Sequence, residues 1–137
     1  MKLFADPTKL LTATIEEDTD NDLWPEFKVH FKPAVEFEVA AAISGGHEGK
    51  MQFLRDKIKS WEGLVADGET AGYLNSTYGQ QLKKTISAGD QIPYHECLLA
   101  TIHSVCINII WTKVAGFARL SSREPTGREV LEKTAKN

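Results

Sequence analysis

The sequence predicts an α+β fold, mainly helical, in which a small N-terminal antiparallel β-hairpin precedes about four helices, the last one long and apolar. Three patterns lead to this prediction: strict apolar–polar alternation near the N-terminus, apolar residues at spacings of three and four in the middle, and a nearly continuous apolar stretch over residues 94–119. A length of 137 residues suits one domain with its own core. We expect a globular domain over residues 1–120 and a polar, flexible tail over residues 121–137.

Two segments near the N-terminus are predicted strands. Residues 10–17 mix β-branched residues with Leu, and residues 26–31 alternate strictly, with Phe27, Val29 and Phe31 on one face. The Asp-rich stretch between them favours a loop, because Asp and Asn side chains bond to their own backbone. The two strands are therefore expected to pair as an antiparallel hairpin with one buried face.

Two helices are expected after the hairpin. The run that follows Pro33 alternates like a strand at first, but it is rich in Ala and ends at a pair of glycines, so we predict a helix. From residue 48 onward, Met51, Leu54, Ile58 and Trp61 recur at helical spacing with charged residues on the other side. This pattern predicts a second, amphipathic helix.

A structural joint is predicted where the second helix ends. Trp61 is interpreted as the last apolar residue of that helix, and Gly63 stops it. Asp67 and Gly68 form a predicted turn that leads to a third helix, whose capping box would begin at Thr77.

The apolar stretch over residues 94–119 predicts one long final helix with a narrow polar stripe. Such a helix is either the central helix of the core or part of an inter-subunit surface, and the two explanations are compatible. We predict self-association, and we place the surface for partners or for a second copy on five residues of this helix: Ile107, Ile110, Trp111, Val114 and Phe117.

The net charge and the residue composition disfavour several classes of function. A net charge of −3 lacks the basic excess of a nucleic-acid-binding surface. Cys97 and Cys106 lie in the most apolar segment, where burial raises a thiol pKa, and His103 with Cys106 supplies only two metal ligands. The uncharged stretch is shorter than the roughly 20 residues of a membrane span. We therefore predict no catalytic residue, no metal, no cofactor and no contact with nucleic acid or membrane.

The order of the segments resembles the tail assembly chaperones of long-tailed bacteriophages. FKVHFKP runs from a strand into a helix, and IKSWEGLVADGETAGYLNSTYGQQLKKTI continues from a Trp-x-Gly pair through Asp-Gly to a capped helix. The positions that match the family motif are Trp61, Gly63, Leu64, Asp67 and Gly68. Gly72 stands about where the family usually has Pro. The resemblance covers roughly residues 24–120.

This resemblance implies a role in tail morphogenesis. Such proteins self-associate and coat the tape-measure protein, and a longer product made by a ribosomal slip recruits tail tube subunits. The residues Ala135-Lys136-Asn137 are compatible with a slippery codon run. The chaperone leaves before the tail is complete, so we expect it in the cytoplasm of the bacterial host and not in the mature virion. The alternative is a structural tail or neck component that stays in the virion.

Overall fold

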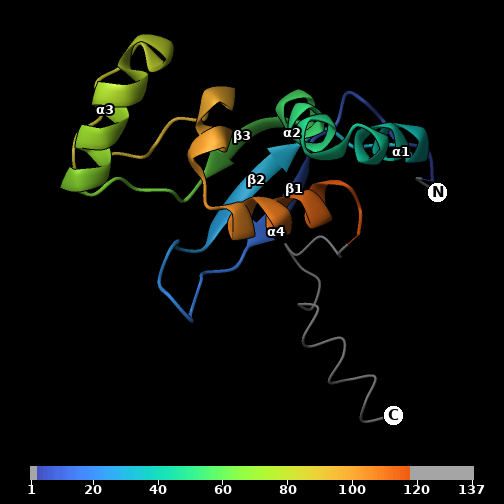
Figure 1. Cartoon of the computed structure of the whole chain (residues 1–137), viewed down its shortest axis with the longest axis horizontal. Helices are drawn as coiled ribbons and strands as arrows, with labels where there is room; N and C mark the ends of the chain where they lie inside the picture. The colour runs from blue at the N-terminus through green and yellow to red at the C-terminus, as the bar shows by residue number, and fades with distance from the viewer. Residues whose placement is uncertain (1–2, 118–137) are drawn as a thin grey trace.

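The computed structural model describes residues 3–117 and shows a three-stranded antiparallel sheet flanked by five helices (Figure 1). The strands follow one another in space as β1-β2-β3, so β2 is central. In chain order the elements are β1 (Leu11–Ile15), β2 (Phe27–Phe31), α1 (Glu36–Ser44), α2 (Gly46–Lys57), β3 (Ile58–Glu62), α3 (Gly68–Leu82), the 3-10 helix η1 (Glu96–Thr101) and α4 (Ser104–Val114). The N-terminal hairpin is confirmed, because β1 and β2 pair antiparallel from Leu11 opposite Phe31 to Ile15 opposite Phe27.

The predicted fold class is wrong in its third strand. The helix that was expected to reach Trp61 ends at Lys57, and the chain continues as β3 alongside β2. The register between β2 and β3 shifts at His30 and Phe31, so that Phe31 lies opposite Ile58 and Val29 lies opposite Trp61. Directly opposed residues share a face. The bulge thus lets Ile58 and Trp61, three residues apart, point into the same core, and their spacing imitates a helix.

The predicted long apolar helix is also wrong within the described residues. Ile102 and His103 have extended backbones with ψ of 143° and 138°, and they separate η1 from α4. The break changes the direction of the chain, so that Leu98 and Leu99 of η1 and Ile110 of α4 all become fully buried. At roughly 100° per residue, a straight helix would spread the buried residues of this stretch, from Leu98 to Trp111, over more than half of its circumference, and the sheet could not cover them from one side.

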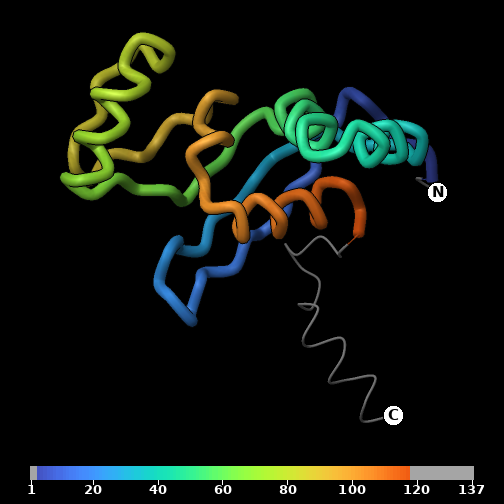
Figure 2. Tube along the Cα trace, in the orientation of Figure 1, coloured from blue at the N-terminus to red at the C-terminus, as the bar shows by residue number. Residues whose placement is uncertain are grey.

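The core lies between the inner face of the sheet and the helices α2 and α4. Figure 2 shows α4 crossing close to β1, with α2 above it in this view. The rings of Phe53 and Trp111 meet edge to face with centroids 5.2 Å apart, an arrangement favoured by the ring quadrupoles. Lys113 donates from Nζ to the backbone carbonyl of Thr14, which ties the end of α4 to strand β1.

Helices α1 and α2 form an antiparallel pair joined at Gly45. The first of these helices is confirmed, and its C-terminal Gly pair indeed separates two helices. Glu38 links their far ends: its carboxylate accepts from Lys57 Nζ at 2.6 Å and from the backbone N–H of Val35 at 3.1 Å. The bond from Lys57 is the main cause that holds the pKa of Glu38 below its usual value.

Substituting Glu38→Gln is expected to lower the free energy of unfolding by about 1–2 kcal/mol at neutral pH. A carboxyl whose pKa is lowered by folding stabilises the protein above the unfolded-state pKa, which is 4.5 for this residue type. That stabilisation is lost as the pH falls through the lower pKa of the folded state. Urea unfolding of both proteins across pH 2.5–7 should therefore show a difference that disappears in acid. Glu36→Gln, in the same exposed first turn, is the control and should change stability by less than about 0.5 kcal/mol.

Helix α3 extends from the rest of the protein on two antiparallel segments (Figure 1). Ala66 N–H donates to the Asp90 carbonyl at 2.9 Å, and Ile92 N–H donates to the Leu64 carbonyl at 2.8 Å. The helix starts at Gly68, because the Asp67 side chain caps it by accepting from Thr70 N–H at 2.7 Å. The start predicted at Thr77 is therefore wrong.

None of the helices within residues 3–117 combines the length and the apolar character needed to cross a bilayer. The tail expected at 121–137, and the end of the domain expected at residue 120, lie outside the described residues.

Candidate functional site

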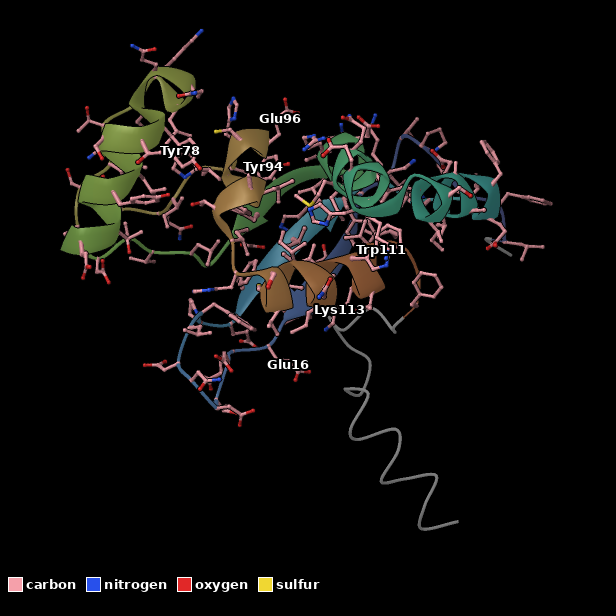
Figure 3. All side chains as sticks on the ribbon, in the orientation of Figure 1. Glu16, Tyr78, Tyr94, Glu96, Trp111 and Lys113 are labelled. Carbon is pink, nitrogen blue, oxygen red and sulfur yellow. The ribbon has the colours of Figure 1, made fainter. Side chains whose placement is uncertain are left out.

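Trp61 is a joint, but between different elements from those predicted. Its ring is only 9% exposed in β3, and its Nε1–H donates to the carbonyl of Ile92 at 2.8 Å. The ring also meets Tyr94 edge to face at 5.0 Å. Burial raises the pKa of Tyr94 to about 12, and Figure 3 shows this residue close to η1. Trp61 therefore fastens the returning segment 89–92 to the sheet, rather than linking two helices.

The other joint residues turn the chain away from the sheet. Gly63 has φ of +95°, and a Cβ at this position would lie 3.3 Å from the Cα of Phe27, so a side chain would be both strained and crowded. Asp67 is the N-cap of α3 and Gly68 its first residue. Hydrogen bonds from Thr70 lower the pKa of the Asp67 carboxyl, which therefore stays ionised at neutral pH.

A groove of about 450 Å³ opens next to this joint. Four segments that are distant in sequence form it: the loop between β1 and β2, the chain from Leu64 to Thr70, the returning segment at Ile92, and the junction of η1 with α4. Its apolar lining includes Trp24, Leu64, Ile92 and Ile102. Leu23 and Val65 extend this lining outward and are 46% and 55% exposed. The groove thus has an apolar floor that continues onto the surface.

Trp24 is held in place at one wall of the groove. Its Nε1–H donates to the carbonyl of Glu16 at 2.9 Å, and its ring lies 6.4 Å from that of His103. Asp18 fastens the same loop, because its carboxylate accepts from Leu23 N–H at 3.1 Å and its N–H donates to the Trp24 carbonyl at 3.0 Å. The wall is therefore shaped by the loop itself before any partner arrives.

The charged residues that line the groove are all acidic. Glu17 and Asp22 come from the loop, and Asp67 comes from the start of α3. No Lys or Arg is among the described residues that line it, and His103 is the remaining ionisable base. The groove therefore combines an apolar floor with a negative rim.

The partner surface predicted on the final helix is corrected by the structure. Ile107, Ile110, Trp111 and Val114 are all buried, because this side of α4 packs against the sheet and α2. Figure 3 shows Trp111 on the side of α4 that faces α2. Only Phe117 of the predicted set is exposed, at 59%. Of the two explanations for the apolar helix, the core explanation applies to these four residues.

One set of polar residues has the bonding order of a hydrolytic triad. His30 is bonded through Nδ1 to Thr12 Oγ1 at 2.9 Å and through Nε2 to Glu62 Oε1 at 3.0 Å. The Glu62 side chain is 57% exposed, however, whereas the carboxylate of a catalytic triad is buried and orients the imidazole in a low dielectric. We interpret the three residues as a cross-strand ladder on the polar face of the sheet.

The thiols have the character of buried apolar groups. Burial, with a smaller effect from Asp18, raises the pKa of Cys106 to about 12, and burial also raises that of Cys97. Raised pKa values disfavour the thiolate that a nucleophile requires. Within residues 3–117, no three His, Cys, Asp or Glu side chains are grouped so that they could hold a metal ion.

The sequence prediction missed the groove, although one signal pointed to it. Leu23 and Trp24 follow directly on an acidic loop, where two large apolar residues are unusual. We compared the chain with known proteins: no family model, no curated protein and no solved structure matches it.

Proposed function

We propose that this protein is a tail assembly chaperone of a long-tailed bacteriophage that binds an apolar segment of the tape-measure protein in the groove. One observation carries the proposal: the motif on which the resemblance rests also builds this groove. Leu64 and Asp67 line it, while Trp61 and Gly63 hold the segment that contains them against the sheet. The protein acts in the cytoplasm of the host and leaves before the virion is complete.

The size of the groove suits reversible binding. A volume of about 450 Å³ admits a few side chains and not a whole helix, so each contact with a tape-measure segment is modest. A long tape measure offers many such segments, and several weak contacts together hold it while each remains displaceable. Self-association belongs to the same proposal, since linked copies raise the effective concentration of grooves along the tape measure. Phe117 remains exposed for such a contact.

Co-expression with the tape-measure protein of the same genome tests the proposal. The wild-type chain is expected to keep that protein soluble and to co-purify with it, and Leu23→Ser/Val65→Ser is expected to lose most of this binding. Phe37→Ser/Ile43→Ser is the matched control, because these two residues are also exposed and apolar but lie on α1, outside the groove. Equal loss in both variants, or no co-purification at all, would contradict the proposal.

Mass spectrometry of finished particles separates this proposal from that of a structural tail or neck component. A chaperone is expected in the infected cell and absent from purified virions. Stoichiometric presence in the virions would support the structural component instead.

A further inference from the structure

The charge distribution around the groove points to the chemistry of its occupant. We infer that the groove selects a polypeptide segment in which apolar side chains are flanked by Lys or Arg. This inference deepens the proposed function and takes from it only that the groove is a protein-binding site.

Three carboxylates line the groove beside its apolar floor, and they come from two segments that are distant in sequence. Glu17 and Asp22 belong to the β1–β2 loop, and Asp67 belongs to the start of α3. An uncharged apolar segment would cover these carboxylates and remove water from them without giving them a partner, which is costly. A Lys or Arg would pair with a carboxylate while its aliphatic stem covers apolar surface beside Leu23 or Val65.

The groove also disfavours an anionic occupant. The N-terminus of a helix attracts anions, but at α3 this place is already taken by the Asp67 carboxylate, which accepts from Thr70 N–H. Among the described residues that line the groove, His103 is the only one with a basic side chain, whereas three are acidic. An acidic segment would therefore meet net repulsion at the rim.

Peptide binding tests the inference without any phage component. The probe is a short fluorescent amphipathic peptide built of Leu and Lys at helical spacing, compared with a Leu/Glu peptide of the same pattern and with a Gly/Lys peptide. Fluorescence anisotropy with the full chain is expected to show binding of the Leu/Lys peptide and at least about tenfold weaker binding of the other two. Equal binding of the Leu/Glu peptide, or equal binding of the Gly/Lys peptide, would overturn the inference.

Charge-neutralising variants locate the binding. Glu17→Gln/Asp22→Asn is expected to weaken binding of the Leu/Lys peptide about five- to tenfold at low salt. The control Glu36→Gln/Asp56→Asn removes the same charge from exposed helical positions outside the groove and should leave binding unchanged. An equal effect of the two variants would show that the peptide senses only the net charge of the protein, and the inference would fail. Circular dichroism melts of both variants check that each one is folded.

The two experiments can fail separately. If the tape-measure protein does not co-purify but the Leu/Lys peptide binds as described, the proposed function fails and the inference about the groove stands. If the tape-measure protein co-purifies but the rim variants have no effect on peptide binding, the proposed function stands and the inference about the groove fails.

Discussion

Replacing Trp61 with Ala is expected to lower the free energy of unfolding by about 3–5 kcal/mol. The ring is 9% exposed and lies opposite Val29 in the sheet, so its removal leaves a cavity in the core. The change also removes the edge-to-face contact with Tyr94 and leaves the Ile92 carbonyl without its indole donor. Chemical unfolding followed by circular dichroism measures the loss.

Trp61→Phe separates the two contributions of this side chain. It keeps an aromatic ring in the core but removes the indole N–H, so we expect a smaller loss of about 1–2 kcal/mol from the unpaired carbonyl and the reduced packing. An unchanged melting temperature in Trp61→Ala, or an equal loss in the two variants, would contradict the role we give to this ring. Because Ile92 lines the groove, Trp61→Ala should also weaken peptide binding in any fraction that remains folded.

Gly49→Ala is expected to destabilise the protein by about 2–3 kcal/mol, although Ala is the better helix former by roughly 1 kcal/mol. Gly49 lies in the first half of α2, where a Cβ would come within 2.5 Å of the carbonyl oxygen of Ala42 in α1. That atom belongs to the backbone, so the two helices would have to separate. The separation would also disturb the packing of Met51 and Leu54, which are buried on the same helix.

Gly72→Ala in α3 is the matched control for this prediction. It is again a Gly in a helix, but no atom outside its own neighbourhood lies within 4 Å of the added Cβ. We expect this change to stabilise the protein by about 0.5–1 kcal/mol. Thermal unfolding of both variants tests the pair, and the same sign for both changes would contradict the close approach of α1 and α2.

The sequence predicts correctly those parts of the fold whose structure is determined by residues close together in the chain. The alternation of Phe27, Val29 and Phe31 fixes which face of β2 is buried, and the hairpin follows from it. The Ala-rich run and the Gly pair suffice for α1 and its end. In each case, neighbouring residues and the backbone preferences of a few residue types determine the structure.

The sequence-based predictions are wrong where contacts with residues distant in sequence determine the secondary structure. Ile58 and Trp61 have helical spacing, and only the bulge opposite Phe31 makes them strand residues of one face. The helix break at Ile102 and His103 contains no Pro or Gly that would predict it from the sequence. It allows the apolar segments on both sides of the break to be buried in one core. Tertiary packing overrides local preference at both places.

The groove could not be predicted for a related reason. Its walls come from the loop at Leu23 and Trp24, from the chain after Gly63 and from the junction at His103, and no pattern in the sequence shows that these segments meet. Individual residues still carried a signal. The predicted turn at Asp67 and Gly68 marks one wall, although the sequence alone indicates only a structural role for it.

We propose that the groove holds a segment of the tape-measure protein. Photo-crosslinking tests it most directly: a benzoylphenylalanine is placed at Val65, on the edge of the groove, or at Phe37, which is 75% exposed on α1. Both proteins are co-expressed with the tape-measure protein and irradiated in cells. We expect a crosslinked adduct with the tape-measure protein from position 65 and none from position 37. Adducts from position 37 alone, or from neither position while the two proteins co-purify, would contradict it.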